Sequence, residues 1–597
     1  MLKRLIKTNS LIAAFERTYR TLLPEHKKRL PKVLSWVFMV AVADAIGLAT
    51  ALPVVKIAIT PATIETNSFI HGIYLFFGFS SHKNFILCLF IFLLTAFITK
   101  NLFTLWIQYR QSDFSNQVAF DLAEDVWHRY YHQDVNYFND SNSVNLVRNL
   151  TTMPMEFTIN ILMPLLQVLS EFVVIIILVS AIAFYNPYTF LLLLLTLVPG
   201  VILLVRGLKN TLIRNNYSRN SVYMELNVRV SDSLRGFIDV ALLNKKSFFH
   251  QKIHQQHLKL KRHNARIAVL GIAPAKGTEI FALLGILIIL TYSLIINPFQ
   301  DNLNVIMAYV LAAYRLIPSL NKIIITVNSV KSFSYVYDVL NEHPKPENIE
   351  TPEEGATKLQ FAQDLSFQNI SFRYPDDKKW ILKDFSLSIK KGDNVGIIGP
   401  SGSGKTTLIN LLLRFLQQNE GQILLDGVAI TPQNQQAWRN MIGYVKQNVF
   451  LFDTTFAGNI AVGCNPEDID QKRLHSAIQL ARLEEVLSHM PNGLNTMLGE
   501  GGAKLSGGQR QRIAIARALY HEAQILVFDE ATSALDSETE RDITDAIESL
   551  SGENRTMIIV AHRITTLKNC NIIYELREGS IYNTFSYDQL VDSKLKL

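Results

Sequence analysis

The sequence is poor in cysteine and in charge. Cys88, Cys464 and Cys570 are its three cysteines in 597 residues, too few and too scattered for a disulfide framework or a metal cluster. We expect them to be small buried residues. Charged residues make up 18% of the chain and hydrophobic residues 49%, whereas soluble domains carry about 25% charged residues. This composition excludes a disordered, secreted or collagen-like protein and predicts that part of the chain lies in lipid.

The basic and acidic residues are unevenly distributed. Residues 1–340 contain 32 Lys and Arg against 18 Asp and Glu, whereas residues 341–597 contain 26 against 33. A nucleic-acid-binding protein would carry its basic patch on the soluble part. The basic half here is the apolar one, so we expect no nucleic-acid partner.

Six windows in the first half are long and apolar enough to cross a membrane. They are residues 33–59, 84–107, 159–184, 187–207, 268–296 and 303–327. The 32-residue leader and the long connections are rich in Lys and Arg, while the intervening loops contain almost none, which predicts that both termini are cytoplasmic. The low cysteine content favours a bacterial cytoplasmic membrane, with an organelle as the alternative.

The two long cytoplasmic connections have helical periodicity. Residues 114–131 and 215–263 extend the neighbouring spans, with tips expected near 134–140 and 232–239. In the first outer loop, residues 64–79 place apolar side chains on one broad side, which predicts an amphipathic helix at the outer membrane surface; an ordinary loop with aromatic anchors is the alternative.

Ionisable residues inside the spans are costly and therefore informative. Six of them are singled out here: Asp44, Lys100, Glu171, Lys276, Glu279 and Arg315. Lys276 and Glu279 can neutralise each other. Lys100 and Arg315 are candidates for binding an anionic substrate, and a pair between helices with Asp44 or Glu171 explains them equally well. A row of His250, His254 and His257 is expected to be a solvated helix face rather than a metal site.

After a Pro- and Glu-rich linker at 341–360, short strands alternate with helices. A strand at 394–398 leads into a loop with the GxxxxGK[ST] pattern and then an apolar helix, the context that a phosphate-binding loop requires. The loop consists of Gly399, Pro400, Ser401, Gly402, Ser403, Gly404, Lys405, Thr406 and Thr407. Its backbone N–H groups would surround phosphates, Lys405 would reach the β- and γ-phosphates of ATP, and Thr406 would bind Mg²⁺.

Two further motifs accompany this loop. The buried strand 525–529 ends in Asp529, which suits the Mg²⁺ shell, and Glu530, which can polarise the attacking water. Between the motifs, N–H groups at a helix start form a second phosphate cradle. Its residues are Leu505, Ser506, Gly507, Gly508 and Gln509. Since Lys405 already has a full cradle, we expect the second one to face the ATP of another subunit.

Residues 361–597 resemble the nucleotide-binding domain of ABC transporters. In this resemblance Tyr374 matches the aromatic residue that stacks on adenine, and Gln447 matches the loop that touches Mg²⁺ and the membrane domain. Asp536 matches the loop that crosses the dimer seam, and His562 matches the histidine that holds the γ-phosphate. The resemblance implies ATP and Mg²⁺ as cofactors, catalysis by Glu530, His562, Gln447 and Lys405, and a homodimer of half-transporters.

The whole chain resembles an ABC exporter half-transporter, most closely the PglK-like flippases of lipid-linked oligosaccharides, on residues 170–174 and 314–319. The implied fold is a polytopic α-helical membrane domain with six spans, of the type IV exporter kind, joined to an α/β P-loop nucleotide-binding domain. We expect a leader at 1–32, the membrane domain at 33–340, the linker at 341–360 and the ATP-binding domain at 361–597. Lys100, Lys276 and Arg315 would line the substrate cavity.

Three alternatives were weighed, and two of them remain open. A multidrug, lipid or peptide exporter would use the same ATPase domain. An ATP-gated channel or regulatory membrane receptor would also use it, although the intact hydrolytic residues argue against this reading. A soluble ABC ATPase does not fit the six predicted spans. The identity of the cargo, and pairing with a related half-transporter instead of a second copy, are not determined by these patterns.

Overall fold

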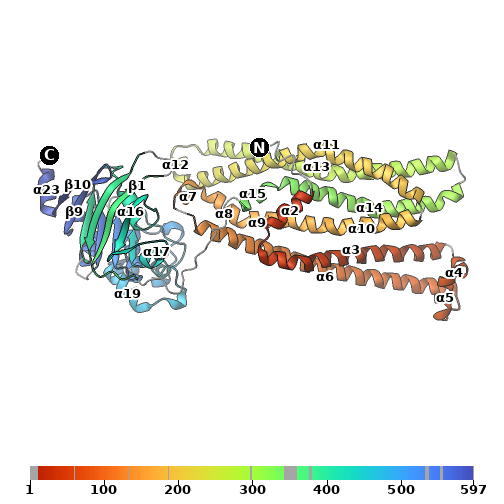
Figure 1. Ribbon diagram of the computed structural model, residues 1–597, viewed down its shortest axis with the longest axis horizontal. Coiled ribbons are helices and arrows are strands. Elements are labelled where there is room, and N and C mark those ends of the chain that lie inside the picture. The colour runs from red at the N-terminus through yellow and green to blue at the C-terminus, as the bar shows by residue number, and fades with distance from the viewer. Residues whose placement is uncertain are drawn as a thin grey trace. The chain divides into compact units, whose positions relative to one another are not determined.

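The computed structural model describes residues 11–59, 61–133, 135–185, 187–295, 299–341, 359–374, 379–531, 537–550 and 555–595. The chain divides into two compact units, Met1–Glu347 and Asn348–Leu597, which are coloured red to green and green to blue in Figure 1. The first unit is helical, and the second contains both strands and helices.

Long helices build the first unit. They are α3 (Pro24–Ile59), α6 (His82–Tyr131), α10 (Met163–Tyr185), α11 (Pro187–Arg235), α13 (Lys246–Ile295) and α14 (Phe299–Ser332). A 50-residue helix such as α6 is about 75 Å long, more than twice the roughly 30 Å of a bilayer core. The predicted extension of the spans beyond the membrane is therefore confirmed.

Among the described residues, four stretches are long and apolar enough to cross a membrane: Pro24–Gly47, His82–Tyr131, Met153–Phe184 and Lys246–Ile288. In the most apolar window of α6 only 6% of the residues are buried, because its large side chains face outward, as lipid-facing residues do. The windows 187–207 and 303–327 lie in α11 and α14, where many side chains fall outside the described set. The count of six spans stays a prediction.

Short helices connect the long ones. They are α2 (Leu11–Thr21), α4 (Thr63–Thr66), α5 (Ser68–Phe76), α7 (Val135–Asp140), α8 (Ser143–Thr151), α9 (Met153–Phe157), the π-helical turn η1 (Thr158–Leu162), α12 (Phe237–Leu242) and α15 (Tyr335–Leu340). The first predicted tip contains α7. The second tip extends from the end of α11 at Arg235, inside the predicted 232–239, through α12 to the start of α13 at Lys246. Asn244 in this connection has φ 52°, a conformation that asparagine tolerates.

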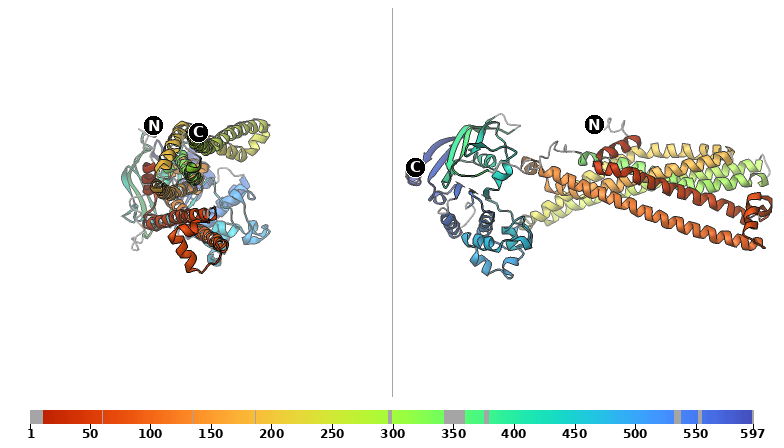
Figure 2. Two further views of the ribbon diagram at one scale, coloured as in Figure 1. Left: turned by 90° about the vertical axis from the view of Figure 1, so that its right-hand side faces the viewer. Right: turned by 60° about the horizontal axis from the view of Figure 1, so that its bottom comes forward.

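The connection between α3 and α6 contains α4 and α5, and together these elements form one hairpin (Figures 1 and 2). Ile70, Ile73 and Tyr74 of α5 pack against a small core. Phe69 and Phe76, by contrast, are 77% and 84% exposed. The apolar side of α5 is thus divided between residues that pack on this core and residues that are exposed, and an amphipathic helix at the membrane surface stays a prediction.

The second unit contains two sheets in its described residues. An antiparallel sheet has the order β2-β1-β4-β5. Its strands are β1 (Asp364–Phe372), β2 (Leu382–Lys390), β4 (Glu420–Leu425) and β5 (Val428–Ala429). The second sheet has the order β10-β9-β3-β8-β7-β6, parallel except for β10. Its strands are β3 (Asn394–Ile398), β6 (Ile442–Val445), β7 (Ile525–Asp529), β8 (Thr556–Val560), β9 (Ile572–Arg577) and β10 (Ser580–Phe585).

Helices surround these sheets. They are α16 (Lys405–Leu412), α17 (Gln435–Arg439), α18 (Phe456–Ile460), α19 (Gln471–Leu480), α20 (Glu484–Ser488), α21 (Gly507–Tyr520), α22 (Ser537–Leu550) and α23 (Tyr587–Leu595), with single 3₁₀ turns η2 (Pro466–Asp468), η3 (Gly493–Asn495), η4 (Glu500–Gly502) and η5 (Ile564–Leu567). β7 and β8 are buried almost throughout, as expected for parallel strands covered on both faces. Leu359, at the end of the predicted linker, already packs into the core of this unit.

The cysteines differ in their surroundings. Cys570 is buried as expected, Cys464 is half-buried and Cys88 is exposed. Cys88 lies in α6 within a predicted span, where lipid rather than protein would cover it. All three are free thiols.

Candidate functional site

The phosphate-binding loop connects β3 to α16. At Gly399, which has φ 155°, an added Cβ would lie 2.4 Å from the Leu576 carbonyl oxygen. Gly404 has φ 101° directly before α16. Both positions need glycine, because a side chain would collide at the first and strain the backbone at the second. The loop therefore presents its backbone to whatever it binds.

The polar groups inside the loop are donors. The Nζ atom of Lys405 donates to the carbonyl oxygens of Gly399 and Pro400, at 2.9 and 3.0 Å. Burial lowers the pKa of Lys405, and the carboxylates of Glu530 and Asp529 oppose this effect. The Ser403 hydroxyl is buried without a hydrogen-bond partner among the described residues. A cradle of N–H groups, an ammonium group and a hydroxyl matches the chemistry of phosphate.

The other predicted catalytic residues follow neighbouring parallel strands. Asp529 ends β7, Glu530 follows it, His562 follows β8 and Gln447 follows β6. These strands lie side by side with β3, so their carboxyl ends bring the residues to one edge of the sheet, where ligands of α/β proteins bind. The order of the strands therefore places these motifs at the same edge, while their roles in the ATP site stay a prediction.

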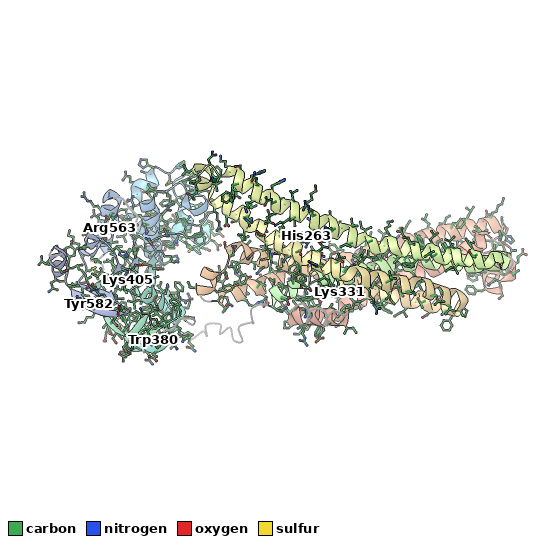
Figure 3. All side chains as sticks on the ribbon, turned by 90° about the horizontal axis from the view of Figure 1, so that it is seen from above. His263, Lys331, Trp380, Lys405, Arg563 and Tyr582 are labelled. Atoms are coloured by element: carbon green, nitrogen blue, oxygen red, sulfur yellow. The ribbon has the colours of Figure 1, made fainter. Side chains whose placement is uncertain are left out.

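Two hydrogen bonds organise the acidic residues. The His562 Nε2 atom lies 2.7 Å from the Glu530 Oε1 atom, and Glu530 has φ 50°, a conformation that is unusual for glutamate and typical of functional sites. Arg563, labelled in Figure 3, pairs with Glu540.

Tyr444 in β6 was missed by the sequence analysis. Its hydroxyl donates to the Asp529 Oδ2 atom at 2.9 Å. Burial and the neighbouring carboxylate raise the pKa of Tyr444, so the phenol remains protonated and can donate. Burial also raises the pKa of Asp529, and the hydrogen bond from Tyr444 opposes this effect. No local signal in the sequence identifies Tyr444, because its partner lies on a neighbouring strand 85 positions away.

The second predicted cradle stands at the start of α21. Ser506 and Gln509 form a capping box, in which the Gln509 N–H donates to the serine hydroxyl and the Ser506 N–H donates to the glutamine side chain. Ser506 and Gly507 are exposed. Leu505 is buried in one core and Leu408 of the phosphate-loop helix in another. The two cradles therefore belong to separately packed parts of the unit.

The remaining predicted ATP-site residues differ in how exposed they are, and one of them lies outside the described residues. Tyr374 is half-buried, and its ring contacts Phe372 edge-on at 5.2 Å between centroids. Ser401 and Thr406 are exposed, whereas Thr407 is buried. Asp536 lies outside the described residues.

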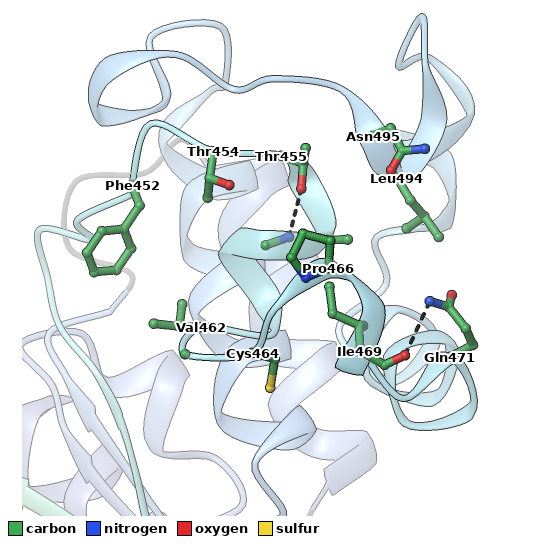
Figure 4. Close-up of a pocket in the computed structure, with 13 residues that line it drawn as sticks. Phe452, Thr454, Thr455, Val462, Cys464, Pro466, Ile469, Gln471, Leu494 and Asn495 are labelled. Carbon is green, nitrogen blue, oxygen red and sulfur yellow. Dashed lines mark hydrogen bonds between the residues drawn. The ribbon is translucent and has the colours of Figure 1, made fainter.

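A separate cavity of about 560 Å³ lies beside α18 (Figure 4). Phe452, Thr454, Cys464 and Leu494 are among its lining residues. None of the predicted ATP-site residues lines it. No Lys or Arg side chain is among its lining residues.

The six ionisable residues singled out within the predicted spans are all paired. Asp44 binds both Lys100, at 2.9 Å, and Arg315, at 2.7 Å. This confirms the pairing between helices considered for the two cations. Glu171 instead accepts from Ser319 at 2.5 Å and from Lys322 at 2.6 Å. Lys276 and Glu279 neutralise each other at 3.1 Å and are exposed. The described residues contain no group of three or more side chains able to hold a metal ion, and the rings of His250 and His254 stack on the surface of α13.

These features define an ATPase unit joined to a bundle of membrane-crossing helices. A model of the ABC transporter family matches residues 382–533. An ATP-dependent lipid A-core flippase of Cupriavidus pinatubonensis is 32% identical over 81% of this chain and 82% of its own length. Another from Ralstonia nicotianae is 33% identical over 68% and 69%. The fold is similar to that of a bacterial Atm1-family ABC exporter solved with ATP bound, with TM-score 0.73 and 22% identity over 95% and 96% of the two chains.

The chain belongs to the ABC transporter family. It is an integral membrane protein with an exporter fold, and its second unit binds and hydrolyses ATP to drive transport. The predicted resemblance to ABC exporters is confirmed. The relatives named here are lipid A-core flippases rather than flippases of lipid-linked oligosaccharides.

Proposed function

We propose that two copies of this chain use ATP to move a phosphate-bearing lipid to the outer leaflet of a bacterial inner membrane. Two cargo classes fit: the lipid-linked oligosaccharide that the sequence favoured, and the lipid A-core named for the relatives. Both join a phosphorylated headgroup to a lipid tail. The observation that carries the proposal is the pair of cations, Lys100 and Arg315, held together inside the membrane unit of an ATPase.

The ATP chemistry follows from the contacts of the second unit. Lys405 would exchange its two carbonyl partners for phosphate oxygens, since both are weaker partners for an ammonium group than a charged oxygen. Glu530 would polarise the attacking water, and its bond to His562 fixes the direction of the carboxylate. His562 would then hold the γ-phosphate, with Gln447 beside it. Tyr374 would stack on adenine.

The residues also suit Mg²⁺, the usual companion of ATP. Thr406, Gln447 and Asp529 offer a hydroxyl, an amide and a carboxylate, the oxygen donors that this ion prefers. Tyr444 holds the Asp529 carboxylate in place through Oδ2. When bound, Mg²⁺ supplies positive charge next to the β- and γ-phosphates.

A dimer would complete each ATP site. We propose that Ser506, Gly507 and Gly508 of one copy face the ATP held by Lys405 of the other, with Asp536 at the seam. The exposed helix start at Ser506 and Gly507 supports this arrangement, because the N-terminal end of a helix attracts phosphate. ATP would then hold the copies together until hydrolysis releases them.

The orientation follows from the distribution of charge. The basic leader and the basic connections predict that residues 1–32, both termini and the ATPase unit at 361–597 lie in the cytoplasm. The membrane domain would span 33–340, and residues 341–360 would link it to the ATPase. Lys276 would line the cavity together with Lys100 and Arg315.

Reconstitution in liposomes tests this function. With ATP, lipid A-core or polyprenyl-pyrophosphate oligosaccharide should become accessible on the far leaflet, whereas phosphatidylcholine should not. Lys100→Ala and Arg315→Ala should each slow this movement by about tenfold or more, because a phosphate in a nonpolar site needs opposite charge. Glu530→Gln should bind ATP and move nothing. Equal rates for the wild type and the two cation variants would overturn the proposed cargo chemistry, and transport of uncharged drugs would favour a multidrug exporter.

A further inference from the structure

One carboxylate inside the membrane unit is shared by two cations from two other helices. Asp44 lies on α3, Lys100 on α6 and Arg315 on α14. Each oxygen of the Asp44 carboxylate takes one partner: Oδ1 accepts from the Lys100 ammonium and Oδ2 from the Arg315 guanidinium. All three side chains are 20–22% exposed, so the cluster can be reached from outside the helix bundle.

The cluster carries more positive charge than its carboxylate neutralises. Two cations against one anion leave a formal charge of +1. The Arg315 Nε atom is buried and has no hydrogen-bond partner among the described residues. Lys100 also lies over the ring of Phe97, 5.5 Å from its centroid, which adds only a weak attraction. An unneutralised charge at membrane depth is costly, so a second anion would bind here favourably.

Glu171 provides a contrast within the same unit. Its carboxylate is 6% exposed and accepts from Ser319 and Lys322, which both belong to α14. This pair contains one cation for one anion and is formally neutral. Such a neutral, buried pair is typical of a contact that only joins two helices, here α10 and α14. The Asp44 cluster differs in charge, in exposure and in joining three helices.

We propose that Asp44 is an internal substitute for the phosphate of the cargo. This inference rests on the proposed function above. Without cargo, the two oxygens of the Asp44 carboxylate bind Lys100 and Arg315. A phosphate also presents several charged oxygens, so it displaces the carboxylate and is attracted in addition by the unneutralised positive charge of the cluster. Asp44 thereby prevents the cations from retaining cargo after transport, and it restores their pairing when the lipid leaves.

The consequence is a lowered affinity for phosphorylated lipids. While Asp44 occupies the two cations, the site cannot bind phosphate. If the site is free for only a fraction of the time, the apparent dissociation constant of the lipid equals the intrinsic one divided by that fraction. Removing the internal carboxylate should therefore strengthen binding, although it removes an ion pair from the protein. A merely structural Asp44 predicts the opposite result, because its loss would disorder both cations.

The test measures the lipid concentration that gives half-maximal stimulation of the ATPase in nanodiscs. Asp44→Asn should lower this concentration by about tenfold for lipid A-core and for polyprenyl pyrophosphate, tested in separate arms to distinguish the two sources of phosphate. Phosphatidylcholine should show no change. Glu225→Gln is the matched control, since Glu225 pairs with Arg229 on α11 away from this cluster and its loss changes the net charge equally.

A second variant covers the case in which Asp44→Asn does not fold. At Gly47 an added Cβ would lie 3.1 Å from the Lys100 Cδ atom, so Gly47→Ala should push Lys100 away from Asp44 without removing a charge. It should shift the half-maximal concentration in the same direction by about twofold to threefold. Weaker or unchanged binding of phosphorylated lipid in both variants would overturn the role of Asp44.

The cation variants separate this failure from failure of the proposed function. Suppose that Lys100→Ala and Arg315→Ala weaken stimulation by phosphorylated lipid, whereas Asp44→Asn does not strengthen it. The proposed cargo chemistry then stands, and the proposal that Asp44 takes the place of the cargo phosphate is wrong. If the cation variants respond to these lipids as the wild type does, the proposed cargo is wrong, and Asp44 is then only a contact between helices.

Discussion

Each of the two carboxylates in the candidate ATP site is oriented by a hydrogen bond from a neighbouring side chain. Glu530 is held by His562, and Asp529 is held by Tyr444. Both carboxylates carry out their proposed roles only if their oxygens face the nucleotide. A hydrogen bond to one oxygen orients the other, in the way that outer-shell partners orient metal ligands.

We predict that Tyr444→Phe weakens metal binding. The ring would still fill its place, but Asp529 would lose the donor at 2.9 Å. Loss of such a partner usually costs about 10- to 100-fold in metal affinity. Electron paramagnetic resonance of Mn²⁺ bound with ATP would measure the affinity directly, and the Mg²⁺ dependence of the ATPase would follow it. Tyr582→Phe, at an exposed tyrosine of β10, is the control. Unchanged Mn²⁺ affinity would show that Tyr444 is a packing residue.

Most residues of the candidate ATP site were proposed from the sequence alone. The glycines, Lys405, Asp529, Glu530 and His562 could be identified because their spacing is tied to local chemistry. Tyr444 could not, because its partner is 85 positions away and the contact depends on the order of strands in the sheet. The shared use of Asp44 was likewise only one of two pairings that the sequence allowed.

At the scale of elements, β6 and α21 pack unusually closely. An added Cβ at Gly443 would lie 2.4 Å from the Ala518 Cβ atom and 2.9 Å from the Leu526 side chain. Gly443 is buried in the strand that carries Tyr444, and Ala518 belongs to the helix that begins with the Ser506 cradle. This contact sets the distance between two parts of the ATP machinery.

We predict that Gly443→Ala destabilises the second unit. Overpacking of this kind costs about 1–3 kcal/mol, and each kcal/mol lowers Tm by about 2–4 °C in a unit of this size. Differential scanning fluorimetry would measure the shift. Gly207→Ala, where nothing lies within 4 Å of the added Cβ, should leave Tm unchanged or slightly higher. A Tm for Gly443→Ala equal to that of the wild type would mean that α21 can move away from β6 at no cost.

The long helices were predictable and the irregular turn between α9 and α10 was not. Apolar runs and helical periodicity determine α6 and α13 locally. The π-helical turn η1 depends on tertiary partners: Pro164 has no N–H for the Asn160 carbonyl oxygen, and the Ser329 hydroxyl of α14 donates to that oxygen at 2.7 Å instead. A sequence shows the proline, but not the serine 169 positions away that compensates for it.

At the scale of the whole molecule, the split composition predicted two units with different surroundings. The apolar, basic half became a bundle of long helices and the acidic half an α/β ATPase. The composition does not predict the oligomeric state of the protein. The exposed cradle at Ser506 has the same sequence whether it faces solvent or a partner subunit.

We predict that two inactive variants restore activity when mixed. Lys405→Ala removes the ammonium group from its own phosphate loop. Ser506→Asp keeps a good helix cap but places a carboxylate where the partner's phosphate would lie. If each ATP lies between Lys405 of one copy and Ser506 of the other, each variant alone has two broken sites. Half of the randomly paired dimers then have one intact site, giving about a quarter of the wild-type ATPase rate. If a single copy bounds its own ATP, Ser506→Asp remains active alone, and mixing yields only the average of the two preparations.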